Sequence, residues 1–463
     1  MTPAPARRGP PRDRARGDSR AGRDDRGRDG DARPTRNTRS PRAVAVAALM
    51  RVEDGAYAHL SLPDVLRRSD LSGRDRAFVT ELVYGTLREQ QSLDRALRKH
   101  SRRPIDELDP DVRAALRMGA YQLVHGMSPH AAVGETVSTV DGKVRGVVNA
   151  VLRSLQDGGL PDPHSPGYVR GSYPRWIVED LEAAYGVEDT AATLAAMNEP
   201  PAATLRVHAG RGTVESVIAE VEAAGGTVER GALLADALIV RGAGDLARLD
   251  AIRDGRASVQ DQSSQAVAAL LEARPGEHVL DVAAAPGGKS AAVAEAMGDT
   301  GVVCAGDRHE GRVAVIRRGT ERLALGSVVA FVADGRHLPF ARDSFDRVLL
   351  DAPCSGLGVL RRRPDARHRV TREMIAEVAG LQRDLLVEAA TMVKPGGRLV
   401  FSVCTLTRTE TAGIDAFAAS ELPELVAVAP PGPPWRRVGR GAVLLPHVAG
   451  TDGMFVLVLD RAR

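Results

Sequence analysis

Cysteines, aromatic residues and long apolar runs are scarce in this sequence, and each absence narrows what the protein can be. With only three cysteines, Cys304, Cys354 and Cys404, a chain of 463 residues has no disulfide framework, which suits a reducing compartment. No apolar run approaches the roughly 18–20 residues that span a bilayer. No apolar segment follows the Arg-rich N-terminus either, which argues against a secretory signal. We therefore expect a cytoplasmic protein with no membrane contact.

Metal-binding motifs and aromatic platforms are also missing. The sequence contains neither a CxxC pair nor an HExxH motif, so we expect no metal site. Only 3% of the residues are aromatic, which argues against the binding of nucleic-acid bases by stacking on a broad surface. A target base is better accommodated by flipping into a pocket. No pattern in the sequence indicates the oligomeric state.

Positive charge is concentrated at the N-terminus. Residues 1–42 contain 13 Arg and 6 Asp, a surplus of seven positive charges, and because the whole chain has a net charge of +3, the remainder sums to −4. Residues 1–40 show no apolar periodicity, so we predict that this tail is disordered. Two interpretations of the tail are open: a loose RNA tether, or a solubilising segment with no specific role. The rest of the chain needs local basic patches to hold a polyanion.

The spacing of apolar residues divides the rest of the chain into four segments. Residues 41–156 have apolar residues at spacings of three and four, which predicts an all-α domain. Residues 157–172 are rich in Pro, Gly and Ser and are predicted to be a linker. Residues 173–255 mix helix and strand patterns, as expected of a small α/β subdomain. Over residues 256–463 strands alternate with helices, which predicts a mostly parallel, doubly wound α/β sheet.

The first strand of this sheet ends in a glycine turn. Residues 279–282 supply the short apolar run typical of a covered parallel strand, and a helix is predicted over residues 291–297. Gly287 and Gly288 have no Cβ atom, so a ligand can approach the backbone and the free N–H groups of the new helix. An α/β protein binds a nucleotide-like ligand at such a turn.

Acidic residues end the next three predicted strands and indicate which ligand the turn holds. Asp307 lies 19 residues after Gly288, where it can accept hydrogen bonds from a ribose diol. Asp334 and Asp351 end the third and fourth strands, and a single such residue would more often be a helix cap. Three of them suit a ligand with a cationic sulfonium, and the turn lacks the GxGxxG pattern of dinucleotide sites. The pattern favours S-adenosylmethionine over NAD.

Two cysteines follow neighbouring strands of the predicted sheet. Cys354 lies just after the fourth strand, and Cys404 ends the fifth. Neighbouring strands lie roughly 4.8 Å apart, so we expect both thiols to meet at the carboxyl edge of the sheet beside the ligand. Cys304 lies inside the second strand and is predicted to be an inert buried residue.

A thiolate beside a methyl donor indicates covalent catalysis on a pyrimidine. C5 of cytosine is a poor nucleophile, but addition of a thiolate at C6 moves electron density onto C5, which can then accept a methyl group. The added charge reaches N3, and Asp351 is the carboxyl group on the adjacent strand end. A hydrogen must later leave C5 before the thiol is eliminated, and Cys354 is the nearest candidate to assist that step.

Residues 41–156 resemble the NusB family of RNA-binding helical domains. The resemblance is carried by Asp75, residues 81–88, residues 116–123, Glu135 and residues 148–153. It implies an RNA-binding front end, although many of the matching apolar positions are also what a helical core requires.

The final segment resembles the Sun/NOL1/NOP2 family of RNA 5-methylcytosine methyltransferases. The matching motifs are residues 283–289, Asp307 with Arg312, Asp334, residues 351–356, Cys404 and residues 450–455. Together with the NusB-like front end, the chain is similar to the RsmB-type branch of this family, which acts on 16S ribosomal RNA. The resemblance implies a class I methyltransferase fold of Rossmann-like type, S-adenosylmethionine as cofactor and ribosomal RNA as partner.

The resemblance also implies roles for particular residues. Cys404 corresponds to the nucleophile, and Cys354 to the residue that aids product release. The residues expected to contact S-adenosylmethionine or the reacting base are Ala283, Ala284, Ala285, Pro286, Gly287, Gly288, Lys289, Asp307, Arg312, Asp334 and Asp351. Three departures concern the placement of RNA: Val403 replaces the Thr that the family has before the nucleophile, only Glu410 matches its acidic–Asn run, and His368 or its neighbour replaces the Trp expected after the basic stretch that begins at Arg361.

A basic stretch follows the Cys354 motif and is the predicted RNA contact. It contains Arg361, Arg362, Arg363, Arg367 and Arg369. Because the stretch lies beside the predicted active site, we expect it to bind phosphates, the alternative being a solvated Arg-rich loop. Two other functions stay open: a tRNA cytosine-C5 methyltransferase, and a non-catalytic RNA-binding or ribosome-assembly factor that keeps a methyltransferase fold.

Overall fold

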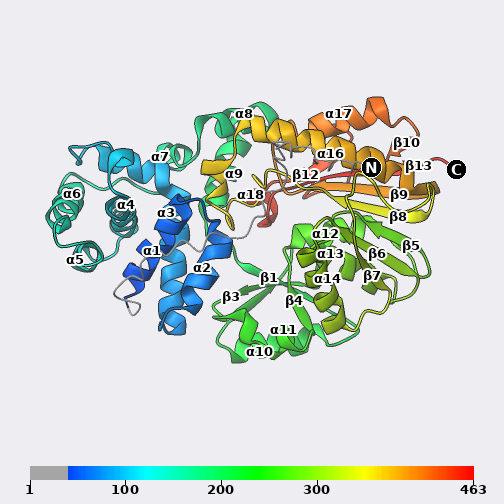
Figure 1. Ribbon diagram of the computed structural model, residues 1–463, viewed down its shortest axis with the longest axis horizontal. Helices are drawn as coiled ribbons and strands as arrows, with labels where there is room; N and C mark the ends of the chain where they lie inside the picture. Colours follow the sequence, from blue (N-terminus) through cyan, green and yellow to red (C-terminus); the bar gives the residue numbers. More distant parts are fainter. Residues whose placement is uncertain (1–39) are drawn as a thin grey trace, which may run out of the picture. The chain divides into compact units, whose positions relative to one another are not determined.

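The computed structural model describes residues 40–463 of the chain (Figure 1). The Arg-rich tail lies outside the described residues except for Ser40, so neither interpretation of the tail is tested. Among the described residues, no helix combines the length and the apolar character that a membrane span requires. The same residues contain no group of three or more His, Cys, Asp or Glu side chains that could hold a metal ion.

The first part of the described chain is entirely helical, as predicted. Its elements are α1 (Pro41–Glu53), α2 (Ala58–Arg67), α3 (Gly73–Arg98), the 3-10 helix η1 (Ile105–Glu107), α4 (Pro110–Val124), α5 (Pro129–Val137) and α6 (Arg145–Asp157). Ser40 and Ser72 cap α1 and α3 by accepting backbone N–H groups. The helices share one core, in which Leu82, Leu116 and Leu152 are buried.

Three more helices follow where a linker and the start of the α/β subdomain were expected. They are α7 (Pro166–Gly171), α8 (Arg175–Tyr185) and α9 (Val187–Asn198). Pro166 is the first residue of α7, a position that tolerates proline, and Tyr168 and Val169 are buried. Leu181 of α8 and Leu194 of α9 share a core with Leu445 of the last segment. These helices therefore pack against the final domain.

A small antiparallel sheet follows these helices. Its elements are β1 (Ala203–Val207), α10 (Val214–Ala223), β2 (Thr227–Arg230), β3 (Ala237–Arg241), η2 (Leu246–Arg248), α11 (Asp250–Arg253) and β4 (Ala257–Val259), with strand order β2-β3-β1-β4. Leu205, Val217 and Leu238 lie in its core. The predicted mixture of helix and strand is confirmed, although the largely exposed β2 carried no apolar pattern that could be recognised.

The last part of the chain forms the large sheet. Its elements are α12 (Gln262–Leu270), β5 (His278–Asp281), α13 (Gly288–Ala296), β6 (Val302–Asp307), α14 (Glu310–Leu323), β7 (Val328–Val332), β8 (Phe345–Asp351), α15 (Ala366–Arg369), α16 (Arg372–Met392), β9 (Val393–Val403), α17 (Ala412–Glu421), β10 (Leu425–Ala427), β11 (Arg436–Val438), β12 (Gly441–Leu444), α18 (Pro446–Ala449) and β13 (Met454–Arg461). The strand order is β11-β12-β13-β9-β8-β5-β6-β7, with β10 paired to β13.

This sheet confirms the predicted doubly wound α/β fold. Strands β5 to β9 pair in parallel, whereas β13 runs antiparallel to β9. Helices α16 and α17 pack on one face of the sheet, and α12 and α13 pack on the other (Figure 1). The carboxyl ends of β5, β6, β8 and β9 therefore meet at one edge, which is where such folds bind ligands.

Candidate functional site

Two loops bring Cys354 and Cys404 together at the carboxyl edge of the sheet. β8 ends at Asp351, three residues before Cys354, and Cys404 directly follows the end of β9. The two Sγ atoms lie 3.3 Å apart, and both residues are partly accessible. The sequence predicted this convergence from strand order, and the structure brings the two sulfur atoms into hydrogen-bonding contact.

The environment of the two thiols distinguishes them. The hydrogen bond with Cys404, together with burial, raises the pKa of the Cys354 thiol well above its usual value. The negative charges of Glu410 and Asp351 act in the same direction. Cys354 is therefore held as the neutral thiol, and its S–H can donate to the sulfur of Cys404.

Asp351 and Lys289 form an ion pair beside the thiols. Nζ of Lys289 donates to Oδ2 of Asp351 at 2.7 Å, and Oγ of Ser402 donates to Oδ1 at 2.7 Å. Burial by itself would lower the pKa of Lys289, but the charge of Asp351 and its hydrogen bond raise it, so the ammonium group stays charged. The Asp351 side chain remains 32% exposed, so it is open to a ligand at this edge.

The glycine turn has the geometry expected for close approach to a ligand. Gly287 has φ = 100°, in the left-handed region that favours glycine, and it is the N-cap of α13. A Cβ atom there would also lie 3.3 Å from Cγ2 of Ile316. The first N–H groups of α13 have no helical acceptor, so this end of the helix suits an anionic group. Residues 283–286 connect β5 to this helix and line the same edge.

The remaining predicted cofactor residues lie along the neighbouring strand ends. Asp307 ends β6 with its side chain almost buried, and Nε of Arg312 lies 3.3 Å from its Oδ2. Arg312 also donates to the carbonyl of Ala285 at 3.1 Å, so it connects Asp307 to the glycine turn. Asp334 follows β7, and hydrogen bonds from the side chain and backbone of Arg336 lower its pKa.

Asp281 is a candidate that the sequence reasoning missed. It ends β5 and is 2% exposed, with Oγ of Ser290 donating to its Oδ2 at 2.6 Å. Oδ1 has no hydrogen-bond partner among the described residues. Burial raises the pKa of Asp281 to about 7, opposed by the bond from Ser290. Its signal in the sequence was the one used for Asp307: an acidic residue at the end of a predicted strand.

Backbone contacts fix the two cysteine loops to each other. The N–H of Gly358 donates to the carbonyl of Cys404 at 3.0 Å, and the N–H of Gly453 donates to the carbonyl of Gly358 at 2.9 Å. A Cβ atom on Gly358 would collide with the carbonyl oxygen of Gly453. Only glycine therefore allows this approach, and the segment around Gly453 contributes to the site by covering the Cys354 loop.

The structure corrects the interpretation of Arg367 as a phosphate contact. Arg367 is fully buried, and its guanidinium lies 4.0 Å from the ring centre of Tyr173. Its Nη1 donates to the carbonyl of Arg88 at 2.6 Å and to Oδ1 of Asn198 at 2.9 Å. A phosphate has no access to this side chain. The sequence could not distinguish an exposed arginine from one whose acceptors lie far away along the chain.

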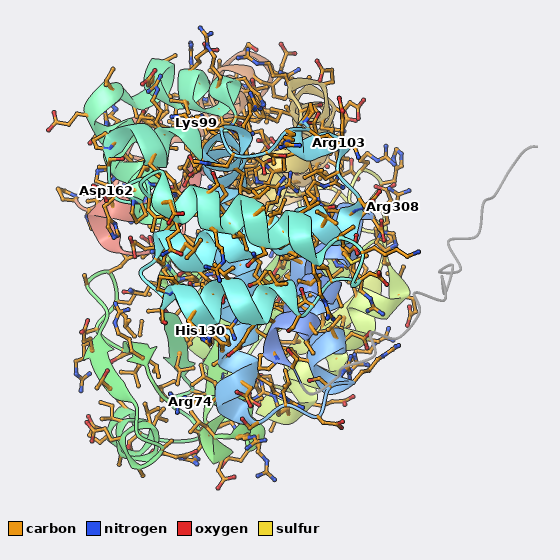
Figure 2. All side chains as sticks on the ribbon, turned by 90° about the vertical axis from the view of Figure 1, so that its left-hand side faces the viewer. Arg74, Lys99, Arg103, His130, Asp162 and Arg308 are labelled. Atoms are coloured by element: carbon orange, nitrogen blue, oxygen red, sulfur yellow. The ribbon has the colours of Figure 1, made fainter. Side chains whose placement is uncertain are left out.

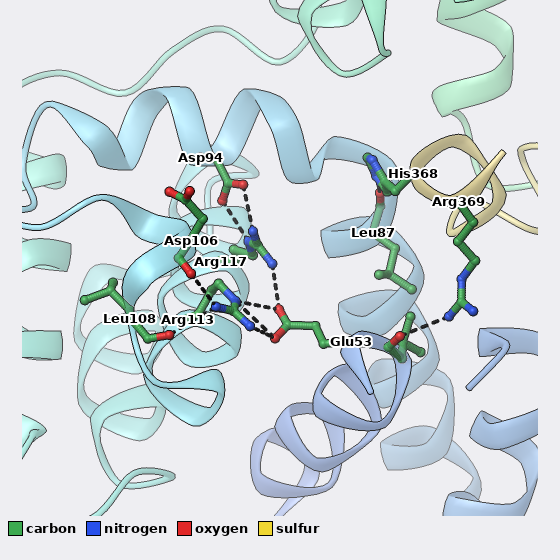
Figure 3. Close-up of polar contacts among 10 residues, drawn as sticks. Glu53, Leu87, Asp94, Asp106, Leu108, Arg113, Arg117, His368 and Arg369 are labelled. Atoms are coloured by element: carbon green, nitrogen blue, oxygen red, sulfur yellow. Dashed lines mark hydrogen bonds and ion pairs between the residues drawn. The ribbon is translucent and has the colours of Figure 1, made fainter. Parts of the chain in front are cut away.

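Arg369 also contacts the helical domain (Figure 3). It donates to the carbonyls of Val52 and Gly55 at the end of α1, at 3.0 and 2.7 Å. His368, its neighbour, contacts the carbonyl of Leu87 at 3.0 Å. In the same view Glu53, the last residue of α1, accepts hydrogen bonds from both Arg113 and Arg117. The end of α1 that Arg369 contacts is therefore itself held by ion pairs.

The other three arginines of the basic stretch differ in exposure. Arg361 is almost buried and donates to the carbonyl of Gly450 at 2.6 Å. Arg362 pairs with both Asp261 and Asp452, at 2.9 and 2.7 Å. Arg363 is exposed, and it alone of the five predicted arginines keeps its side chain open to a phosphate. The stretch is thus mainly an internal connection and not an open basic surface.

Comparison with known proteins decides the family. A protein of Bacillus subtilis (strain 168) named "Probable ribosomal RNA small subunit methyltransferase B" is 36% identical over 452 residues, which cover 91% of this chain and 99% of that protein. The chain belongs to the RsmB/F family of 16S rRNA methyltransferases. The model of that family matches residues 268–460, the NusB family model matches residues 39–157, and the model of the RsmF/B-like ferredoxin-like domain matches residues 173–247.

Further relatives and solved structures agree with this family. "Ribosomal RNA small subunit methyltransferase B" of Pseudomonas syringae pv. tomato is 36% identical, with 91% of this chain and 97% of that protein covered. The crystal structure described as that of PH0851 has a TM-score of 0.77 at 25% identity and covers 91% of this chain and 99% of its own. NSun6 from Pyrococcus horikoshii with SFG has a TM-score of 0.57 at 22% identity, over 63% of this chain and 98% of that one, which shows the fold.

Membership in the RsmB/F family confirms several of the predictions made from the sequence. The chain has the NusB domain and the class I methyltransferase domain that were expected from the sequence, and the predicted small α/β subdomain is identified by its family model as ferredoxin-like. It is a methyltransferase, and S-adenosylmethionine is the cofactor of the family.

Proposed function

We propose that this protein methylates C5 of a cytosine in 16S ribosomal RNA through a covalent bond between Cys404 and C6 of the base. The observation that carries the proposal is the pair of sulfur atoms 3.3 Å apart, next to Asp351 at the ligand-binding edge of the sheet. The names of the relatives support ribosomal RNA as the substrate. Three free cysteines suit a reducing compartment, and we propose that the protein is cytoplasmic.

The residues at the edge of the sheet fit S-adenosylmethionine. The open N–H groups of α13 at Gly288 and Lys289 suit the carboxylate of the amino-acid part. Asp307, fixed by Arg312, suits the ribose hydroxyls, and Asp281, whose Oδ1 lacks a partner, suits a donor group. When it is bound, S-adenosylmethionine supplies a methyl group on a cationic sulfonium. Asp334 and residues 283–286 border the same space.

Cys404 begins the proposed reaction. Its thiolate forms a bond to C6, and the electron pair of the C5–C6 double bond moves toward C5 and, through the ring, toward N3. We assign Asp351 to the N3 side of the base, where the charged ammonium of Lys289, with its Nζ 2.7 Å from Oδ2 of Asp351, offsets the negative charge that develops on the ring. C5 is then nucleophilic enough to accept the methyl group.

Cys354 completes the proposed cycle. The hydrogen bond with Cys404 is the largest reason that its pKa is raised, and that bond is lost when the Cys404 sulfur becomes bonded to C6. The Cys354 thiol then becomes more acidic and, being partly accessible, can pass its proton to water. Its thiolate removes the hydrogen from C5, the C5–C6 double bond forms again, and the bond from C6 to the Cys404 sulfur breaks.

The helical domain supports an RNA substrate. It matches the NusB family, and one of its faces presents exposed cationic side chains, among them Arg74, Lys99 and Arg103 (Figure 2). Such side chains contact phosphates without reading sequence.

Cysteine variants test the proposal. We expect Cys404→Ala to lose transfer of tritium from labelled S-adenosylmethionine to 16S ribosomal RNA, by on the order of 10⁴-fold or more. Cys354→Ala should accumulate a protein–RNA adduct that survives a denaturing gel. Wild-type turnover by Cys404→Ala would refute the nucleophile assignment. Equal or better labelling of transfer RNA would instead favour the tRNA enzyme, and no labelling of either RNA would favour a non-catalytic factor.

A further inference from the structure

A buried carboxylate lies directly behind the two thiols. Glu410 follows β9 and is completely buried, and no Lys or Arg pairs with it within residues 40–463. It nevertheless accepts five hydrogen bonds: from the N–H and Oγ of Ser355, from Oγ1 of Thr405 and Thr407, and from Nε2 of Gln382. Burying a carboxylate is unfavourable unless its lone pairs are satisfied in this way.

Two of these donors occupy equivalent places in the chain. Ser355 directly follows Cys354, and Thr405 directly follows Cys404. The Ser355 N–H donates to Oε1 of Glu410 at 2.8 Å, and Thr405 Oγ1 donates to Oε2 at 3.0 Å. The two hydroxyl oxygens also lie 2.8 Å from each other. One carboxylate therefore holds the neighbour of each cysteine.

A third side chain closes the arrangement on the other side of Cys354. Gln382 of α16 is fully buried, and its Nε2 donates both to the carbonyl of Pro353 at 2.9 Å and to Oε1 of Glu410 at 3.0 Å. Both residues that flank Cys354 are thus fixed to Glu410, one directly and the other through Gln382. Among the described residues, no hydrogen bond joins Glu410 or Gln382 to either sulfur atom.

We propose that Glu410 is a positioning residue, which sets the separation of the two thiols and so places Cys354 to act on the Cys404–cytosine adduct. The inference rests on the proposed function, since it presumes an adduct to resolve. Loss of the carboxylate leaves the Ser355 N–H without its acceptor and Gln382 with the Pro353 carbonyl alone, so the Cys354 loop is no longer fixed to the segment that follows Cys404. The Cys404 loop keeps its backbone bond to Gly358, so adduct formation persists while release slows.

The first test compares Glu410→Ala and Glu410→Gln with a matched control in the full-length protein. Asp415→Asn is the control, because Asp415 is also a nearly buried carboxylate close by in sequence, but it binds Arg440 and neither cysteine loop. For Glu410→Ala we expect turnover to fall about 100-fold, as for a 1 Å displacement of a reacting group, while the trapped protein–RNA adduct increases. Glu410→Gln should recover part of the turnover, because its carbonyl oxygen can still accept from Ser355.

A second test needs neither RNA nor cofactor. Diamide takes two electrons and two protons from a pair of thiols as they form a disulfide, and peptide mapping separates the Cys354–Cys404 pair from Cys304. We expect Glu410→Ala and Thr405→Val, which removes one donor and keeps the side-chain shape, to form this disulfide several-fold more slowly than wild type and Asp415→Asn.

The outcomes separate the two proposals. If adduct and turnover fall together in Glu410→Ala, in proportion to a lowered melting temperature and as in Asp415→Asn, then Glu410 only stabilises the fold. An unchanged disulfide rate in both Glu410→Ala and Thr405→Val would overturn the positioning role as well. If Cys354→Ala traps no adduct, the proposed function fails, whereas the disulfide rates still report whether Glu410 sets the spacing of the thiols.

Discussion

Two halves of the segment that connects β8 to α16 serve different parts of the molecule. Residues 352–358 lie at the carboxyl edge of the large sheet and present Cys354 beside Asp351 and Cys404. Residues 361–369 instead contact Asp452, α3 and the end of α1, and most of their charged groups are buried or paired. The difference teaches that charge alone does not mark a binding surface. A binding site is indicated by a polar group that still has an unused hydrogen-bond donor or acceptor.

The largest effect that we expect concerns the edge of the sheet. Asp281 has a pKa raised to about 7, so between about pH 4 and pH 7 the folded protein holds a proton that the unfolded chain has lost. Stability from this group is therefore present at low pH and is lost as the pH rises through 7. Asp281→Asn removes that loss, and relative to wild type it should gain up to about 4 kcal/mol between pH 4 and pH 8. Urea unfolding without cofactor at both pH values measures the gain.

If the stability gained by Asp281→Asn did not change with pH, the carboxylate of Asp281 would have enough hydrogen-bond donors in its charged form. The edge of the sheet would then have no more unused hydrogen-bonding capacity than the arginine segment.

A somewhat smaller effect is expected in the arginine segment. Arg367→Ala leaves a cavity and removes the donor from the carbonyl of Arg88 and from Asn198, so we expect stability to fall by about 3 kcal/mol. The dependence of RNA affinity on salt concentration should not change, because the side chain is enclosed. Thermal unfolding and filter binding measure the two quantities. If the RNA affinity of Arg367→Ala depended less on salt while its stability were unchanged, Arg367 would be a phosphate contact after all.

The smallest effect separates the exposed arginine from its buried neighbours. Arg363→Ala should leave the melting temperature unchanged, because the side chain is exposed. If Arg363 contacts one phosphate, the slope of log affinity against log salt should decrease by about 1. Binding to 16S ribosomal RNA at several salt concentrations measures that slope, with Arg367→Ala as the matched control. If wild type and Arg363→Ala had the same slope, Arg363 would not contact a phosphate, and none of the five predicted arginines would be an RNA contact.

Strand order explains why much of the site could be predicted. In a parallel sheet the ends of β5, β6, β8 and β9 meet at one edge whatever else the chain does, so Asp307, Asp351 and the two cysteines could be placed from their positions after strands. Gly287 and Gly288 could be recognised as a ligand-binding turn because they stand between the first predicted strand and the helix that follows it. The general arrangement of helical, mixed and doubly wound parts followed from apolar periodicity.

The rest depended on contacts between residues that lie far apart in the chain. Arg367 finds its acceptors 279 and 169 residues away, at Arg88 and Asn198, and nothing local to the arginine indicates them. α7 was obscured by Pro and Gly, which favour a linker unless tertiary packing buries Tyr168. Glu410 could be noted as a family match, but its five hydrogen bonds come from the segments after β8 and β9 and from the middle of helix α16, which only the folded chain brings together.

The position of β13 has a consequence for how the enzyme is made. Residues 454–461 pair with β9 in the interior of the sheet, and Gly453 just before them covers the Cys354 loop. During folding, β9 exposes one unpaired side and the Cys354 loop lacks its cover until residues 453–461 join the sheet. The catalytic edge is therefore complete only once this strand has paired, and a chain in which it has not paired exposes a strand edge that favours aggregation.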